Sequence, residues 1–318
     1  MGKCMSKKYD KVPELSLRQY TDGSEADRTE FCQALYDGFK HFGFIILKDH
    51  PVSTELLDKA YDRSQAFFEL NEPTKKSYVQ NNGHQRGYSP FGKEHAKNSK
   101  YPDLKEFWHV GRDFKPDSSY AKQHPENLWP KEVEGFQDTM TRLFRELDET
   151  GQIMLEALTP SLDLPKDYFR DLAGQGNSIL RLLHYPPVPD DVDPNCVRAA
   201  AHEDINLITV LVAASQSGLE LLDRDGKWLP VETDKNNLIV DAGDMLSRIT
   251  NEVIPSTTHR VVNPTGPNLS RYSMPFFIHP NSDAMLKCIP SCIGDGAKYP
   301  EILADDFLSQ RLKEIGLR

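Results

Sequence analysis

The region from about residue 177 to 280 is a series of short segments rich in β-branched and aliphatic residues, separated by turn signals. We expect strands at 178–185, 207–213, 218–222, 227–231, 238–241, 258–263 and 271–279, with a hairpin turn at 223–226. Many short strands at regular spacing are typical of a double-sheet jelly roll. Such a fold encloses an interior, where side chains that are far apart in the sequence can meet.

The rest of the chain has a different texture. We expect helices at 24–42, 53–70 and 131–158, where apolar residues recur every three or four positions, and short strands at 13–17 and 44–47. The segment 71–130 has weak periodicity, and we expect an irregular binding loop. The predicted fold class is therefore α+β: a jelly-roll core with buttressing helices and a helical N-terminal region. We divide the chain into a helical and loop region (1–175), a strand-rich core (176–293) and a C-terminal helix (294–318).

The composition of the chain limits the kinds of molecule it is expected to bind and the cellular compartment in which it is expected to work. The net charge is −10 and the pI is about 5.5, which argues against a nucleic-acid-binding protein. The lysine-containing stretch 93–105 is interrupted by acids, and we interpret it as a solvated loop. The five cysteines are odd in number and scattered, so we expect a reducing, cytoplasmic location without a disulfide framework. No signal peptide or membrane span is expected.

A metal site is predicted in the strand-rich region. Side chains two apart on a strand share a face, so His202 and Asp204 project together, whereas Glu203 projects away. His259 is the candidate third ligand. Two histidines and one carboxylate form a facial triad with open coordination positions, which suits non-haem iron(II). Zinc tolerates the same ligands, so ligand type alone leaves the metal open.

A carboxylate-binding pair follows the second histidine. Strand alternation places Arg271 and Ser273 on one face. An arginine fork binds a carboxylate in bidentate fashion, and a hydroxyl two residues away adds a donor. A metal and such a fork in one cavity suit a dicarboxylic 2-oxo acid.

These motifs, in this order, resemble the isopenicillin-N-synthase-like family of Fe(II)/2-oxoglutarate-dependent dioxygenases. The resemblance covers nearly the whole chain, and it implies a double-stranded β-helix core, in agreement with the jelly roll expected from the strand pattern. It rests on Phe42-Gly43-Phe44 with His50, on the Leu180 to Pro187 segment, on His202-x-Asp204, Gly218-Leu219 and Asp241-x-Gly243-Asp244, on the segment 256–261 around His259, and on Arg271-x-Ser273. Pro51 stands where the family commonly has glycine.

The resemblance implies a role for each of these residues. His202, Asp204 and His259 would bind Fe(II), while Arg271, Ser273 and Tyr185 would bind the distal carboxylate of 2-oxoglutarate. The implied reaction consumes O₂, oxidises a C–H bond by hydroxylation, desaturation or cyclisation, and releases succinate and CO₂; ascorbate is expected in a supporting role. Leu183 stands where many plant members have an asparagine that helps to hold the cosubstrate. Because the carboxylate Asp204 is present, halogenation is not expected.

We expect the substrate to be a small molecule. Candidate contacts in the loop are Arg86, Tyr88, Phe107 and Trp108, and candidates on strands are Phe277 and Arg181. Arg181 shares strand parity with Tyr185, which suggests that it holds a substrate carboxylate. His184 has the opposite parity and is expected outside the pocket, and the remaining histidines, His109 and His279 among them, are expected to be structural or exposed.

Two other interpretations remain open at this stage. One is an iron-dependent oxidase of the isopenicillin N synthase type, which does not use 2-oxoglutarate and keeps the same arginine–serine motif. The other is a metal-containing barrel that only binds ligands, against which the intact triad argues. We expect a monomer or weak homodimer that contacts neither nucleic acid nor membrane.

Overall fold

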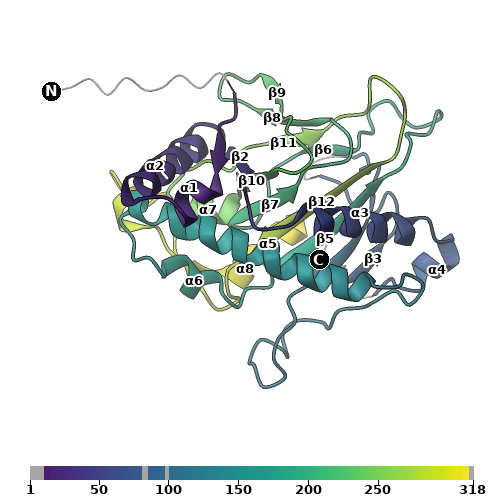
Figure 1. The fold of residues 1–318 in the computed structure, drawn as a ribbon, viewed down its shortest axis with the longest axis horizontal. Helices are drawn as coiled ribbons and strands as arrows, with labels where there is room; N and C mark the ends of the chain where they lie inside the picture. The colour runs from purple at the N-terminus through teal and green to yellow at the C-terminus, as the bar shows by residue number, and fades with distance from the viewer. Residues whose placement is uncertain (1–10, 81–84, 97–99, 315–318) are drawn as a thin grey trace.

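The computed structural model describes residues 11–80, 85–96 and 100–314. Within them, most strands belong to two sheets (Figure 1). The eight-stranded sheet has the order β1 (Glu14–Ser16), β2 (Phe44–Lys48), β10 (Leu238–Ala242), β7 (Ile208–Val212), β12 (Arg271–Ile278), β5 (Ile179–Tyr185), β4 (Glu106–Gly111) and β3 (Gly87–Ser89). The four-stranded sheet has the order β6 (Ala199–His202), β11 (His259–Val261), β8 (Leu219–Leu222) and β9 (Trp228–Pro230). A further pair joins β13 (Met285–Leu286) to β14 (Ile302–Leu303).

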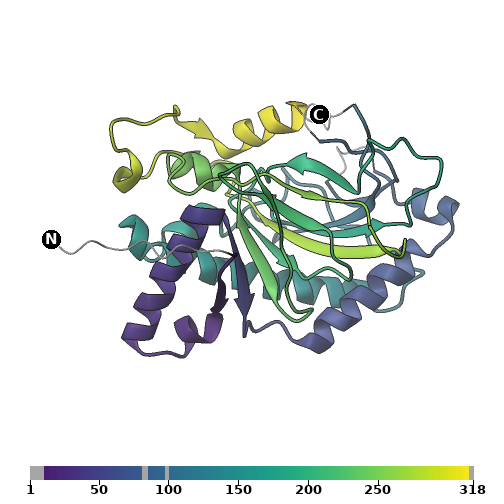
Figure 2. The same ribbon diagram turned by 90° about the horizontal axis from the view of Figure 1, so that it is seen from above.

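The helices lie mainly outside the sheets. They are α1 (Leu17–Thr21), α2 (Glu25–Phe42), α3 (Thr54–Phe68), α4 (Glu72–Lys76), α5 (Phe136–Leu158), α6 (Tyr168–Ala173), α7 (Asp244–Ile249) and α8 (Ala304–Glu314). Figure 2 shows α3 and α5 along one side of the strands and α8 along the other. Helix α5 contacts β4, β7 and β12, and therefore supports the middle of the large sheet. In the described part of the chain, no helix combines the length and the apolar composition needed to cross a membrane.

Alternation along β5 separates two kinds of surface. Leu180 and Leu182 belong to the hydrophobic core beneath the helices, whereas Leu183 and Tyr185 belong to a second cluster with residues of both sheets. The second cluster includes Phe44 and Ile239 from the large sheet and Val261 from the small one. The interior between the sheets is thus distinct from the core beneath the helices.

Local signals account for the predicted N-terminal elements. Helix α2 begins after Ser24, whose side chain accepts a hydrogen bond from the backbone N–H of Asp27 in a capping box, and it ends at Gly43. Gly43 has φ 67°, a left-handed conformation that favours glycine. The prediction for 24–42 is confirmed, as are those for the strands at 44–47, 178–185, 207–213 and 238–241. The hairpin predicted at 223–226 joins β8 to β9.

Other predictions were wrong. The segment 71–130 is not only a loop, because β3 and β4 lie within it and extend the large sheet. Helix α5 begins at Phe136 rather than 131, because Gly135 has φ 71° and interrupts the helical backbone. The C-terminal region 294–318 includes β14, and α8 begins only at Ala304.

Candidate functional site

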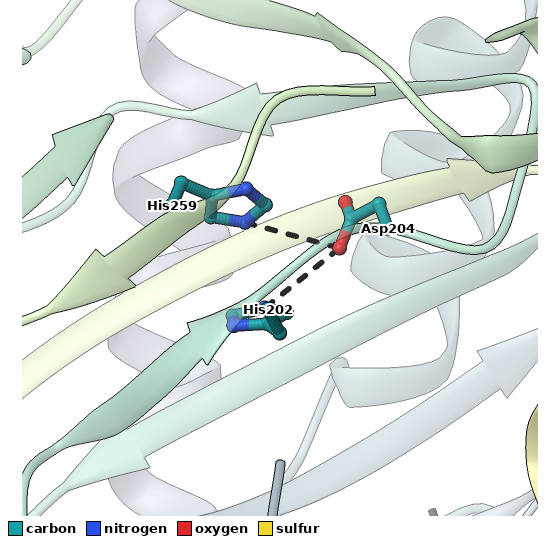
Figure 3. A group of neighbouring side chains, drawn as sticks. All are labelled: His202, Asp204 and His259. Carbon is teal, nitrogen blue, oxygen red and sulfur yellow. Dashed lines mark ion pairs between the residues drawn. The ribbon is translucent and has the colours of Figure 1, made fainter. Parts of the chain in front are cut away.

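His202, Asp204 and His259 come together at the end of the small sheet (Figure 3). His202 ends β6 and His259 begins β11, and the two are directly paired in the antiparallel register. One ligand atom from each of the three residues lies within 4.8 Å of the others. The Nε2 atoms of His202 and His259 lie 3.8 and 3.9 Å from Oδ1 of Asp204. The strand that was expected to run through Asp204 ends at His202, so Asp204 reaches the group from the following loop.

Backbone contacts orient both imidazole rings. Nδ1 of His202 lies 2.7 Å from the carbonyl of Ala200, and Nδ1 of His259 lies 3.1 Å from that of Thr257. A proton on each Nδ1 can be donated to these carbonyls, which leaves Nε2 as a lone-pair donor facing Asp204. Burial, together with the nearby His202, lowers the pKa of His259 to about 4, despite the opposing effect of Asp204. His259 is therefore neutral near pH 7, as a metal ligand must be.

A network of polar contacts fixes the loop that carries Asp204. Thr209 donates to Oδ2 of Asp204, and Asn206 donates to Thr209. The backbone N–H of Asp244, at the start of α7, donates to the Asp204 carbonyl at 2.7 Å. A Cβ at Gly243 would lie 2.3 Å from the Asn206 carbonyl oxygen, so only glycine permits this close approach. The remaining oxygen, Oδ1, faces the two histidines.

A cavity of about 350 Å³ opens beside this group. His202 and Asp204 contribute to its wall, as do Phe277 on β12 and Leu308 and Leu312 on α8. The predicted substrate contacts Arg181, Phe107 and Phe277 all line it. The cavity thus extends from the histidine–carboxylate group across the inner face of the large sheet.

The charges on one wall of the cavity are already paired. Arg181 donates from both Nη atoms to Glu94 at 3.1 and 3.2 Å, and from Nε to His109 at 2.6 Å. Nζ of Lys105 lies 2.6 Å from Glu94 and 2.8 Å from Asp103. Burial alone would raise the pKa of Glu94, but the cations of Arg181 and Lys105 hold it below its ordinary value. Arg181 does bind a carboxylate, but it is the carboxylate of Glu94. The expectation that its guanidinium holds a substrate carboxylate is therefore wrong.

Arg271, Ser273 and Tyr185 form a second polar group on adjacent strands. Arg271 pairs with Tyr185 in the register of β12 and β5, and its Cζ lies 5.1 Å from the tyrosine ring centre. Arg271 is 2% exposed, and its Nε donates to the Gln216 carbonyl at 3.1 Å. Nη1 has no hydrogen-bond partner among the described residues. These three residues are not part of the cavity wall described above, but lie further along the strands.

Three predicted substrate contacts lie elsewhere, and two of them are in the core. Trp108 is fully buried on the helix side of β4, with its ring centre 4.6 Å from that of Phe67. Tyr88 is also in this core and donates from its hydroxyl to Glu106. Strand alternation explains the error, because Phe107 faces the cavity and its neighbour Trp108 must face the opposite way.

Arg86, the third, is buried one layer behind the cavity. Its Nη2 donates to Oδ1 of Asn177 at 2.9 Å, and its Nη1 donates to the Gln85 carbonyl at 2.8 Å. Asn177 and Gln85 line the cavity, whereas Arg86 does not. Its guanidinium lies where a Cβ on Gly111 would be, at 1.8 Å from Cζ, so Arg86 packs across the backbone of β4.

Sequence reasoning missed several residues of the cavity wall. Glu94 and Lys105 were assigned to a solvated loop but are buried, and His109 and His279, expected to be structural or exposed, line the cavity. Alternation on β4 would have indicated His109 had that strand been recognised. The prediction that His184 lies outside the pocket is confirmed, since its Nδ1 is 2.7 Å from Glu106 and its ring stacks on Tyr272.

Two family models match the chain. Residues 12–132 match the N-terminal domain described as "non-haem dioxygenase in morphine synthesis", and residues 176–280 match the 2OG-Fe(II) oxygenase superfamily. A curated relative, the 2-oxoglutarate-Fe(II) type oxidoreductase hxnY of Emericella nidulans, is 31% identical over 306 residues, which cover 92% of this chain and 86% of the relative. Its name and those of other relatives specify 2-oxoglutarate, so the oxidase alternative is not favoured.

Solved structures agree with these matches. A 2OG-Fe(II) oxygenase family protein from Caulobacter crescentus shares 44% identity and a TM-score of 0.86, over 95% of this chain and 98% of that one. A full-length Neurospora crassa protein, solved in complex with α-ketoglutarate (2-oxoglutarate), shares 30% identity and a TM-score of 0.85, over 94% and 95% of the two chains. The chain belongs to the 2OG-Fe(II) oxygenase superfamily and is an iron(II)- and 2-oxoglutarate-dependent oxygenase.

Proposed function

We propose that His202, Asp204 and His259 are the iron ligands of this oxygenase. The supporting observation is the donor set itself: two imidazoles with Nε2 available and one carboxylate oxygen, all within 4.8 Å. Two nitrogens and one oxygen on one side of a metal leave positions open for a chelating cosubstrate and O₂. The contacts with Ala200, Thr257 and Thr209 orient the three side chains in this arrangement.

The distal carboxylate of 2-oxoglutarate is assigned to Arg271, Ser273 and Tyr185. A buried guanidinium nitrogen without a partner is costly, and a ligand carboxylate would satisfy Nη1 of Arg271. Tyr185 pairs with Arg271 across the strands, and Ser273 lies two residues further along β12 on the same face. We also propose that the two sheets form a double-stranded β-helix. Both ends of the cosubstrate would then lie between these sheets.

Bound iron and 2-oxoglutarate supply the chemistry that reduces O₂ and oxidises a substrate C–H bond, with release of succinate and CO₂. The chain's own residues hold and shield the reactants. Thr209 keeps one oxygen of Asp204 engaged, so the other remains directed at the histidines. Phe107 and Phe277, with Leu308 and Leu312 of α8, provide apolar wall that limits water near the substrate.

The proposed substrate is a small, uncharged molecule with polar edges. A volume of about 350 Å³ admits only a small ligand, and the charges of Arg181, Lys105, Glu94 and Asp103 balance one another. An unpaired charge on the substrate would find no free counter-charge among these four residues. The Neurospora crassa protein, which is 30% identical, has been crystallised with α-ketoglutarate and thymine, a neutral ring of this size class.

We further propose that the enzyme works in the cytoplasm as a monomer or weak homodimer. The cysteines of the described residues, Cys32, Cys196, Cys288 and Cys292, are free, which is in keeping with a reducing compartment. Cys4 lies outside the described residues.

Binding under anaerobic conditions tests the ligand assignments. Wild-type protein with Fe(II) and 2-oxoglutarate should develop a weak visible metal-to-ligand absorption. Asp204→Ala should lose this absorption and its bound iron, because an anionic ligand is removed. Arg271→Lys should keep the absorption but require on the order of tenfold more 2-oxoglutarate, since lysine cannot form the two-pronged contact.

A carboxylate outside the site provides the control. Glu220, on β8, is paired with Arg260 at 2.8 Å, and Glu220→Gln should bind iron and 2-oxoglutarate as the wild type does. With O₂ admitted and ascorbate present, succinate formation should be highest for the wild type and Glu220→Gln, lower for Arg271→Lys, and lowest for Asp204→Ala. Iron binding by Asp204→Ala equal to that of the wild type would overturn the triad assignment.

A further inference from the structure

Arg198 is a buried arginine immediately before β6, the strand that ends at His202. Its side chain is 2% exposed, and Nη2 donates to the carbonyl oxygen of Leu269. Leu269 is two residues before Arg271, so the Arg198 guanidinium lies beside the start of β12. Its backbone N–H donates to Oδ1 of Asn263 at 3.1 Å. The Arg198 side chain therefore lies beside the chain segment that leads into Arg271, and the charges of the two arginines influence each other.

Neither arginine has an acidic partner in the described part of the chain. No carboxylate there lies within salt-bridge distance of Arg198 or Arg271, and the hydrogen bonds of both guanidinium groups go to backbone carbonyls and Tyr185. Within the same residues, Nε of Arg198 and Nη1 of Arg271 have no hydrogen-bond partner. By contrast, the buried Arg181 is paired with Glu94.

The guanidinium groups of Arg198 and Arg271 are both buried and both without a counter-ion among the described residues, so their mutual repulsion is unfavourable. Burial and the neighbouring charge of Arg271 lower the pKa of Arg198, while Tyr185 acts in the opposite direction. A buried charge without a counter-ion is costly, and buried charges in proteins are as a rule paired, so we expect a ligand to supply the counter-charge here. The expected ligand is an anion rich in oxygen acceptors, because guanidinium groups bind carboxylates through paired N–H donors.

We propose that Arg198 is a second arginine for the distal carboxylate of 2-oxoglutarate, acting with Arg271 from the opposite sheet. The inference rests on the proposed cosubstrate site. Its consequence is selectivity: two cations at this end favour a dicarboxylic 2-oxo acid over a monocarboxylic one. 2-Oxobutyrate provides the comparison, because it keeps the chelating 2-oxo acid group and lacks the distal carboxylate.

A purely structural role for Arg198 makes a different prediction. Its bond to Leu269 and its backbone contact with Asn263 could simply hold the 263–269 loop against β6. In that case, loss of the charge would affect both 2-oxo acids alike or would lower stability only. The ratio of the two dissociation constants therefore separates the two roles.

The experiment measures anaerobic binding of 2-oxoglutarate and 2-oxobutyrate to the Fe(II)-loaded full-length protein. Arg198→Gln removes the charge and keeps an N–H donor for the Leu269 carbonyl. We expect its Kd for 2-oxoglutarate to rise about tenfold, with the Kd for 2-oxobutyrate within about twofold of the wild type. Arg198→Lys keeps the charge, and its Kd for 2-oxoglutarate should fall between those of the wild type and of Arg198→Gln. Both dissociation constants come from the visible absorption, independently of turnover.

Arg248 supplies a matched control. It also donates to a backbone carbonyl, that of Pro300, and its Nε also lacks a partner among the described residues, but it packs against Tyr299 and Phe307. Arg248→Gln should leave the ratio of dissociation constants unchanged. An unchanged ratio in Arg198→Gln would overturn the role of Arg198 alone. Failure of the iron-loaded wild type to bind 2-oxoglutarate would instead overturn the proposed cosubstrate site.

Discussion

The two faces of β4 show how one strand serves both stability and chemistry. On one face, Trp108 and Val110 are buried beneath α3 and α5 in the main hydrophobic core. On the other face, Phe107 and His109 line the cavity. Neighbouring side chains along a strand are therefore separated by the full thickness of the sheet.

The comparison teaches that burial alone does not identify a functional aromatic residue. Phe107 and Trp108 are both almost fully buried, but only Phe107 lies beside the Arg181 guanidinium, at 4.3 Å from its ring centre. Substitutions on the helix face should change the free energy of unfolding, and those on the cavity face should also change ligand binding. The substitutions of Trp108, Phe107 and Tyr88 below test this separation, and those of Arg181 and Glu94 test the charge pairing on the cavity side.

The largest expected effect is that of Trp108→Ala. The indole packs against Phe67, Tyr78 and Phe136, and its removal leaves a large cavity in the core. We expect a loss of about 3–5 kcal/mol in the free energy of unfolding, measured by urea denaturation. Folded protein at low temperature should still bind Fe(II) and 2-oxoglutarate with near wild-type affinity.

Phe107→Ala is the matched change on the other face of the strand. It should also destabilise the protein, but in addition it removes the ring beside Arg181 and enlarges the ligand cavity. A greater effect of Trp108→Ala than of Phe107→Ala on ligand binding, at equal folded fraction, would contradict the assignment of the two faces.

Sequence reasoning succeeded where alternation could be applied to a recognised strand. It placed Arg181 and Tyr185 on one face of β5 and His184 on the other, as the contacts of these residues show. It failed on β4, which was not recognised within 71–130, so Phe107 and Trp108 were both taken as substrate contacts. The pairing of Glu94 with Arg181 was beyond reach, since contacts between distant loops and strands depend on the tertiary fold.

Arg181→Met is the next largest expected effect. It leaves Glu94 buried with Lys105 as its remaining ionic partner, and it removes the donor to His109. We expect a loss of about 2 kcal/mol in the free energy of unfolding, because charge-assisted hydrogen bonds to a buried carboxylate are broken. The double variant Arg181→Met/Glu94→Gln should recover part of this loss, as a double-mutant cycle would show; strictly additive effects would mean that the two side chains are not coupled.

Glu94→Gln should change how stability depends on pH. The folded-state pKa of Glu94 lies below the ordinary value of 4.5, so ionised Glu94 stabilises the fold above that pH, and the contribution is lost as the pH falls through the folded-state pKa. The wild type should therefore exceed Glu94→Gln in stability at about pH 7, and the difference should narrow below about pH 4.5. Denaturation curves across this range measure it, and a difference that stays constant with pH would contradict the ionised pairing.

Tyr88→Phe is the smallest expected effect, and it tests the helix face without creating a cavity. The hydroxyl is one of several donors to the buried Glu106, which also contacts Lys75 at 2.9 Å and His184 at 2.7 Å. Because the carboxylate keeps these other partners, removal of one donor should cost only about 1 kcal/mol of unfolding free energy. Since Tyr88 lies on the side of the sheet away from the cavity, the Kd values for 2-oxoglutarate and substrate should not change. A rise in the substrate Kd without a loss of stability would mean that Tyr88 contributes to substrate binding. The two sides of the sheet would then not have distinct roles in stability and binding.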